Sequence, residues 1–289
     1  MSRVLLAGAS GQLGSAIASA FADRQVVAHT RATLDVTDAG AVQRAVAGAA
    51  PSVVINCAAF NDVDAAEDHP ADAFAVNALA VRSLARAAED SGAALVHFGT
   101  DFVFDGEANE PYSEEAAPAP RSTYAMSKLV GEWFALDCPR GYVLRVESLF
   151  GLPARWQGRR GTLDTIAAAM EQGRPVKVFT DRVVSLSYVV DIASATRHLV
   201  ETGALPGLYH CVNSGHATWH DVAVETARLL GLEPRLEPIT TSELRLKAPR
   251  PRFCALANRK LAATGFRMAS WQDAVARWIA TRRLVIHDS

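Results

Sequence analysis

The sequence lacks any hydrophobic run that approaches the roughly 20 residues of a membrane span. Its first residues lead directly into an apolar stretch, with no basic segment and no cleavage site, so no secretory signal is visible and a cytoplasmic protein is expected. The formal net charge is only −2, which argues against nucleic acid or a membrane surface as a partner. With 289 residues, 49% hydrophobic and 21% charged, the chain is expected to be globular with a full core.

Cysteine is scarce, and its spacing excludes the common zinc motifs. The four cysteines, Cys57, Cys138, Cys211 and Cys254, are far apart, with no CxxC pair and no Cys/His pairing. We therefore expect no metal site. Cys57 and Cys211 lie in apolar runs that are typical of strands, so the cysteines are expected to be small buried hydrophobic residues in a reducing compartment.

The first half of the chain contains a regular alternation of apolar runs and helical periodicity. Strands are expected at residues 4–7, 25–29, 53–58, 94–98 and 142–146, and helices at residues 13–21, 39–46, 71–91 and 124–136. Repeated strand–helix units predict a parallel sheet with right-handed crossovers. The expected fold class is therefore α/β, with a Rossmann-type doubly wound parallel sheet.

The pattern changes after residue 150. Helices are expected at residues 162–170, 191–201, 219–230 and 271–282, and a short strand at residues 176–179. We predict a dinucleotide-binding Rossmann domain over residues 1–150, completed by strands within residues 181–215. Residues 151–289 are predicted to form mainly a smaller C-terminal α/β lobe that binds the substrate.

A glycine turn follows the first expected strand. Gly8, Gly11 and Gly14 have the spacing GxxGxxG, and a helical pattern begins directly after them. Small residues at such a turn let the backbone N–H groups approach a pyrophosphate, which indicates a dinucleotide site. The expected cofactor-binding residues of this turn are Gly8, Ser10, Gly11, Gln12, Leu13 and Gly14.

The end of the second expected strand bears on which dinucleotide binds. An acidic residue there would favour NAD, but the sequence has Arg31 and no carboxylate. Arg31 could pair with a 2′-phosphate, which favours NADPH, or it could be a solvated loop arginine, which leaves NADH open. Asp35 and Val36 are expected to cover the adenine ring, with Asp35 accepting a hydrogen bond from its amine.

Tyr124 and Lys128 are four residues apart, so on a helix they share one face. A free phenol has a pKa near 10, and a nearby ammonium group is expected to lower the pKa of Tyr124. Tyr124 could then donate a proton to a carbonyl oxygen while hydride reaches the carbon. Thr100 follows an expected strand and offers a hydroxyl to the same oxygen.

At these motifs the chain resembles the extended short-chain dehydrogenases/reductases, and within them the dTDP-4-dehydrorhamnose reductase family. The resemblance covers almost the full length. Besides the glycine turn, it rests on residues 35–38, 54–60, 63–67, 77, 100–106, 124–132, 207–210 and 250–251. It implies that NADPH or NADH reduces the C4 ketone of a dTDP-linked 6-deoxy sugar, with Thr100, Tyr124 and Lys128 as the catalytic residues.

The resemblance also implies further roles on the two sides of the site. On the cofactor side it implies contacts from Ala58, Ala59, Phe60 and Asn77, with Tyr124 and Lys128 beside the nicotinamide ribose. On the substrate side it implies contacts from Asp101, Phe102, Glu147, Ser148 and Arg250.

The chain departs from this family's pattern in the expected sugar wall. Glu147 and Ser148 stand where a Ser-Trp-like pair is usual, Phe102 replaces a tyrosine, and Arg182 replaces the glutamine of an Asp-Gln pair. Glu147 could bind a sugar hydroxyl or pair with a nearby arginine. Ala16 replaces a glutamate that is linked with metal-bridged dimers in some members, so no such dimer is expected, although a homodimer remains open.

Several polar residues have two interpretations. Arg155, Arg159 and Arg160 could form a solvated loop or hold the sugar's diphosphate. His97 and His210 lie at strand-like positions and are expected to be hydrogen-bonded structural residues.

Two other functions remain open at this point. The altered sugar wall would suit a cofactor-binding regulatory subunit that has lost turnover. An epimerase or dehydratase on nucleotide sugars would use the same motifs and keep its cofactor bound.

Overall fold

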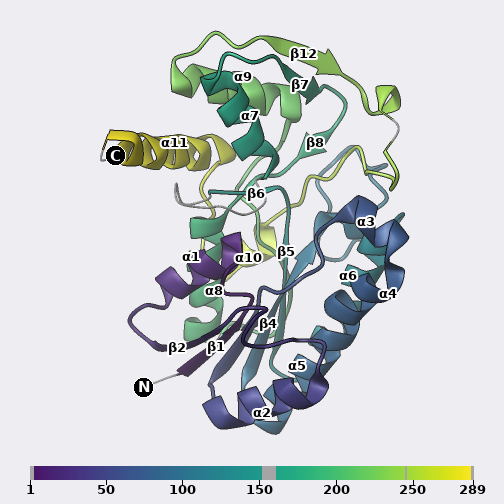
Figure 1. Cartoon of the computed structure of the whole chain (residues 1–289), viewed down its shortest axis with the longest axis vertical. Helices are drawn as coiled ribbons and strands as arrows, with labels where there is room; N and C mark the ends of the chain where they lie inside the picture. Colours follow the sequence, from purple (N-terminus) through teal and green to yellow (C-terminus); the bar gives the residue numbers. More distant parts are fainter. Residues whose placement is uncertain (1–2, 152–160, 245, 288–289) are drawn as a thin grey trace.

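A six-stranded parallel sheet forms the centre of the larger part of the molecule (Figure 1). The computed structural model describes residues 3–151, 161–244 and 246–287. The strands of this sheet are β1 (Arg3–Ala7), β2 (Gln25–His29), β3 (Val53–Asn56), β4 (Ala94–Thr100), β5 (Gly141–Val146) and β10 (Gly207–His210). Their order, β10-β5-β4-β3-β1-β2, reverses direction at β1, as in doubly wound folds. The predicted Rossmann-type α/β class is confirmed.

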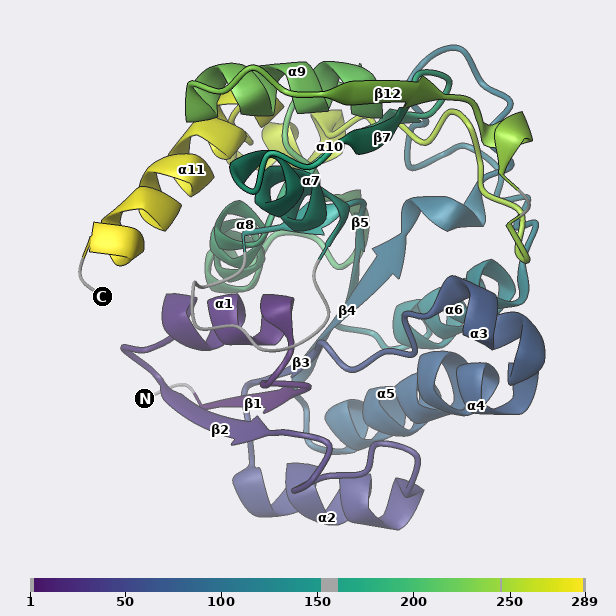
Figure 2. The same cartoon turned by 45° about the horizontal axis from the view of Figure 1, so that its top comes forward.

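Successive side chains of β1 point to opposite faces of the sheet, and both faces are covered by helices. Val4 and Leu6 point into the core under α1 (Gln12–Ala20) and α8 (Val189–Thr202). Leu5 instead packs with α2 (Ala39–Ala49) and α5 (Ala80–Asp90) on the opposite face (Figure 2). Buried strands with two covered faces give the near-continuous apolar runs seen in the sequence.

The expected single helix over residues 71–91 is wrong in its detail. The segment begins as α4 (Pro70–Phe74), widens into the π-helical turn η1 (Ala75–Leu79) and continues as α5. A short helix, α3 (Val63–Asp68), precedes it, capped by the Asp62 side chain. Periodicity alone does not reveal a π turn, because the flanking α-helical pattern continues through it.

The smaller part of the molecule has its own core above the sheet (Figure 1). Its elements are α7 (Thr162–Glu171), β7 (Val176–Phe179), α9 (Trp219–Leu230), β12 (Leu236–Ile239) and α11 (Trp271–His287). Trp219, Trp271 and Trp278 are buried there, and the expected apolar stripe of the last helix supplies two of them. Whether the chain divides at residue 150 stays a prediction, since β10 and α8 pack with the larger sheet.

Short elements connect the two parts. They are the strand pairs β6 (Leu149–Phe150) with β9 (Ser187–Tyr188) and β8 (Val183–Val184) with β11 (Ala217–Thr218). The remaining elements are the helix α6 (Thr123–Leu136), which packs on β4, β5 and α5, the helix α10 (Arg259–Ala263) beside β10, and the 3-10 turns η2 (Asp101–Val103) and η3 (Thr241–Glu243).

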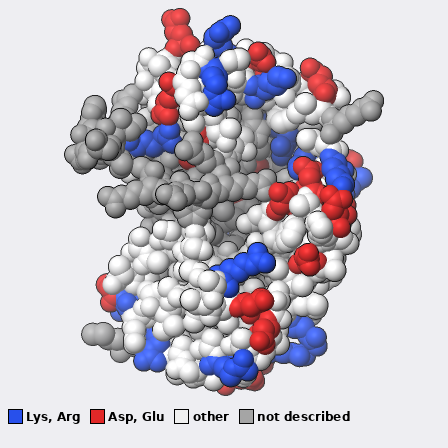
Figure 3. Space-filling view, in the orientation of Figure 1, with Lys and Arg blue, Asp and Glu red and all other residues white. Residues whose placement is uncertain are grey.

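The surface agrees with the balanced charge of the sequence. Lys and Arg are interspersed with Asp and Glu on the face shown in Figure 3. None of the helices in the described ranges is long and apolar enough to cross a membrane. Cys138, Cys211 and Cys254 are buried free thiols, and Cys57 is partly buried.

Candidate active site

A cavity of about 470 Å³ lies where the strand order reverses, at the carboxyl ends of β1, β3 and β4. Doubly wound sheets bind their ligands at this place. The expected site residues that line the cavity are Gly11, Gln12, Leu13, Ala58, Ala59, Thr100, Asp101, Phe102, Tyr124, Lys128 and Ser148. Residues from five separate segments of the sequence therefore meet around one space.

The glycine turn is built for close backbone approach. Gly8 has φ of +78°, and a Cβ there would lie 2.6 Å from the backbone nitrogen of Ala58. A Cβ on Gly14 would collide with the carbonyl oxygen of Gly8. Helix α1 begins without a side-chain cap, so its first N–H groups remain available to an anion. Among the described residues, the buried Nε2 of Gln12 has no hydrogen-bond partner. These features fit a dinucleotide diphosphate.

The remaining residues expected around the cofactor lie beyond β2 and β3. Arg31 is exposed in the loop after β2. Asp35 accepts hydrogen bonds from the backbone N–H and the hydroxyl of Thr37, at 3.0 and 2.7 Å, which lower the pKa of Asp35. Val36 is buried. This segment offers a carboxylate and an apolar side chain next to each other, as the expected adenine contact requires.

Asn77 fixes the loop that follows β3. Its side chain accepts from the Phe60 N–H at 2.8 Å and donates to the Phe60 carbonyl at 3.0 Å. It also donates to the hydroxyl of Ser127 on α6, at 3.0 Å. The fully buried Asn77 therefore binds the loop and the helix of Tyr124 together, instead of lining the cavity.

The three expected catalytic residues are buried and line the same cavity. Tyr124 is 9% exposed, Thr100 5% and Lys128 3%. The Lys128 ammonium donates to the carbonyl oxygen of Phe98 at 2.5 Å. Ser122 caps the start of α6 through the Ala125 N–H, which orients the first turn that carries Tyr124.

Burial sets the protonation of these groups. Burial lowers the pKa of Lys128 to about 8, although the carboxylate of Glu132 raises it in part. Burial raises the pKa of Tyr124, and a hydrogen bond with Thr100 offsets only part of this effect. The expectation of a lowered pKa for Tyr124 is therefore wrong, because desolvation of the phenolate raises the pKa. Tyr124 holds its proton at neutral pH, as a proton donor must.

Two of the expected substrate contacts lie at the rim of the cavity. Phe102 packs edge-on against the ring of Tyr124, with centroids 5.7 Å apart. Arg250 lies 5.9 Å from the Phe102 ring centre and forms an ion pair with Asp64 at 2.8 Å. Ser148 lines the cavity with φ of +47°, an uncommon conformation for a residue other than glycine.

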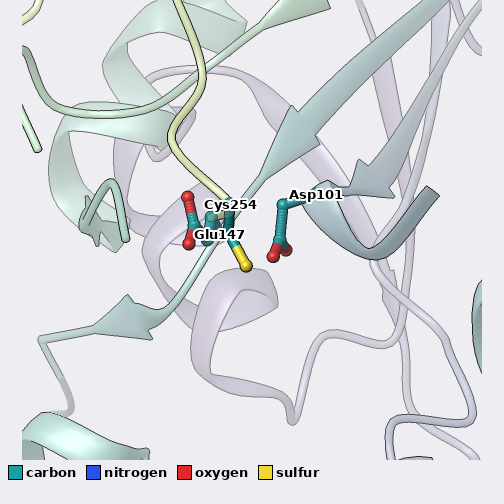
Figure 4. Close-up of side chains that lie close together, drawn as sticks. All are labelled: Asp101, Glu147 and Cys254. Carbon is teal, nitrogen blue, oxygen red and sulfur yellow. The ribbon is translucent and has the colours of Figure 1, made fainter. Parts of the chain in front are cut away.

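Glu147 does not line this cavity. It is 3% exposed and lies close to Cys254 and to Asp101, which does line the cavity (Figure 4). The Ser185 N–H donates to its Oε2 at 2.8 Å. Of the two interpretations of Glu147, the structure supports the nearby arginine: the charge of Arg182 lowers the pKa of Glu147 in part, against the larger effect of burial.

Sequence reasoning missed some of the site. The sequence did not predict helix α3 or its contact with the N-terminus of α6. In this contact, Glu67 accepts hydrogen bonds from the Thr123 N–H and hydroxyl at 2.8 and 2.9 Å. Asp62, an N-cap residue three positions before Ala65, could have predicted the start of α3. Arg155, Arg159 and Arg160 lie outside the described residues.

A glycine turn at the switch point of a doubly wound sheet, together with a buried tyrosine, lysine and threonine, defines a nicotinamide-dependent oxidoreductase of the short-chain dehydrogenase/reductase class. Comparison with known proteins then gives the family. The model of the RmlD substrate binding domain family matches residues 2–284, and the chain belongs to this family.

Named relatives agree over nearly the whole length. The chain is 36% identical over 288 residues to a dTDP-4-dehydrorhamnose reductase of Streptomyces griseus, covering 94% of this chain and 91% of the relative. It is 30% identical to the spore coat polysaccharide biosynthesis protein SpsK of Bacillus subtilis, covering 98% of each. The solved dTDP-4-dehydrorhamnose reductase of Bacillus anthracis in complex with NADP superposes with a TM-score of 0.91 at 29% identity, covering 97% of this chain and 99% of that one.

Proposed function

We propose that this chain reduces the 4-keto group of a dTDP-linked 6-deoxy sugar with NADPH, as the names of its relatives suggest. The observation that carries the proposal is the meeting of the glycine turn with Thr100, Tyr124 and Lys128 around one cavity. NADH is a second candidate donor, because Arg31 is exposed and its contact with a 2′-phosphate is untested. The nucleotide sugar is the proposed partner, and the homodimer and the cytoplasmic location stay predictions.

Each step uses backbone or side-chain groups of this chain. The glycine turn and the first N–H groups of α1 bind the diphosphate, and the bound cofactor supplies hydride. Tyr124 donates its proton to the developing alkoxide. Thr100 donates a hydrogen bond to the same oxygen, and Lys128 presents its ammonium group to the ribose hydroxyls.

The test is loss of NADPH absorbance with a panel of dTDP-4-keto-6-deoxy sugars. Tyr124→Phe removes the proton donor and is expected to lower turnover by about 10²–10⁴-fold. Tyr142→Phe is the matched control. Tyr142 lies on β5 and does not line the cavity, and its hydroxyl donates to the Ala204 carbonyl at 2.6 Å. Turnover of Tyr124→Phe close to that of the control would contradict the mechanism.

The same assay separates the alternatives. Tight NADPH binding without turnover of any keto sugar would favour a regulatory subunit. Purification with one equivalent of oxidised cofactor would favour an epimerase or dehydratase. Of the two altered residues that motivated the regulatory subunit, Ser148 lines the cavity and Glu147 does not.

A further inference from the structure

Asp101, which lines the cavity, and Glu147, which does not, form a buried carboxyl pair (Figure 4). A carboxyl oxygen of each acid and the sulfur of Cys254 all lie within 4.8 Å of one another. Within the described part of the chain, Oδ2 of Asp101 and Oε1 of Glu147 are buried without a hydrogen-bond partner. Two carboxylates so close and so desolvated cannot both be charged at low cost, so the pair retains a proton.

The surroundings decide which acid keeps this proton. Burial and the charge of Asp101 raise the pKa of Glu147 well above its usual range. Burial raises the pKa of Asp101 to about 6, while hydrogen bonds from Thr100 and Cys254 and the charge of Arg182 act against this rise. At neutral pH, Glu147 is therefore the acid and Asp101 the carboxylate. Arg182 balances the single negative charge.

The other titratable groups around the pair come from two further segments. Cys254 belongs to the segment after Arg250, and its thiol lies beside both carboxyls with a raised pKa. Tyr124 comes from α6, and the charge of Asp101 adds to the effect of burial in raising the pKa of Tyr124.

Asp101 competes with the substrate for the hydroxyl proton of Thr100. Thr100 donates to Oδ1 of Asp101 at 3.0 Å, while its oxygen accepts from the Phe102 N–H at 3.3 Å. A hydroxyl has one proton to donate, so this bond keeps it from a carbonyl oxygen in the cavity. Because a hydrogen bond to a charged acceptor is about twice as strong as a neutral one, ionised Asp101 holds Thr100 firmly.

We propose that Glu147 is a positioning residue that transfers its proton to Asp101 and thereby releases the Thr100 hydroxyl to the substrate carbonyl. The inference rests on the proposed function. The two carboxyls lie within 4.8 Å, so a small rotation brings their oxygens into hydrogen-bond contact. The proton then leaves the carboxyl of Glu147 and binds Oδ2 of Asp101, and Oδ1 becomes the weaker acceptor of a neutral acid. The negative charge moves to Glu147, where the Ser185 N–H and Arg182 stabilise it. The pair keeps its total charge, and no other reactant is needed.

The first test is Glu147→Gln, which keeps the shape but has no acid proton to transfer. Its kcat is expected to fall about tenfold above pH 6, the size of one charge-assisted hydrogen bond, with the KM for NADPH unchanged. Below pH 6, Asp101 carries its own proton, so the loss is expected to shrink. The matched control is Glu237→Gln, at an exposed position of β12.

The second test is Asp101→Asn, whose amide cannot ionise and should not need Glu147. In this background, Glu147→Gln is expected to cause no further loss. An equal loss from Glu147→Gln at every pH, or the same loss in the Asp101→Asn background, would show a purely structural role and overturn the proposal.

A third measurement does not depend on turnover. Infrared spectroscopy at pH 7 is expected to show a protonated buried carboxyl in the wild-type protein that is missing in Glu147→Gln. Its absence from the wild type, or one equivalent of divalent metal found by elemental analysis, would overturn the shared proton, since a bound metal displaces protons from its ligands. An intact carboxyl signal in a protein that reduces no keto sugar would instead overturn the proposed function, and the role of the pair with it.

Discussion

Burial changes the chemistry of single residues in this protein more than their nearest charges do. The pKa of Lys128 falls to about 8 and that of Tyr124 rises, both chiefly through desolvation. His210 shows the same effect outside the site. Its ring is fully buried, donates from Nδ1 to the Ala257 carbonyl at 3.2 Å and has its pKa lowered to about 3 by burial.

His210 is expected to make the protein less stable in mild acid. The folded protein keeps this ring neutral down to about pH 3, whereas the unfolded chain protonates it near pH 6.5. The stability from this group is therefore fully present above pH 6.5 and is lost as the pH falls toward 3, by up to about 1.4 kcal/mol per pH unit. Urea unfolding between pH 5 and 7 should show a flatter pH dependence for His210→Asn. The control is His220→Asn, and equal slopes for both variants would contradict the prediction.

At the scale of elements, α6 positions the site by its close contact with the π-helical turn η1. A Cβ on Gly131 would collide with the carbonyl oxygen of Asn77, so only glycine permits this approach. The buried ion pair of Glu132 with Arg145, at 2.7 Å, joins the same helix to β5. The helix that carries Tyr124 is thus fixed on two sides.

Two glycine-to-alanine changes test this contact. Gly131→Ala is expected to destabilise the protein by about 1–3 kcal/mol, because the new methyl group overpacks the contact between the two helices. Gly48→Ala is the matched control in α2, where a Cβ meets no atom within 4 Å. It should stabilise by up to about 1 kcal/mol through helix propensity. Urea unfolding measures the stability of both variants. If Gly131→Ala is as stable as the wild type, α6 does not depend on this close approach.

At the scale of the whole molecule, the cavity lies between two separate cores. One core packs the helices α1 and α8 onto the sheet. The other packs three buried tryptophans, from α9 and α11, with α7. Ligand that binds only the folded chain stabilises it by mass action.

We therefore expect NADPH to stabilise the whole chain. At about 100 times its dissociation constant, it should raise the free energy of unfolding by about 2.7 kcal/mol. Arg31→Ala should reduce the shift caused by a fixed NADPH concentration and leave the shift caused by NADH unchanged, because only NADPH carries the 2′-phosphate. Thermal unfolding measures both shifts. An unchanged NADPH shift in Arg31→Ala would show that Arg31 does not contact the cofactor.

The sequence by itself determined the local features of this protein, because they depend on short-range geometry. Alternating strand and helix patterns predicted the doubly wound sheet. The glycine spacing and the four-residue interval from Tyr124 to Lys128 predicted part of the cavity lining, including Gly11, Tyr124 and Lys128. Only the tertiary structure decided what depends on contacts between distant segments. It buried Glu147 beside Asp101, out of the cavity lining, and raised rather than lowered the pKa of Tyr124. The reason is that burial depends on the whole fold and desolvation increases with burial.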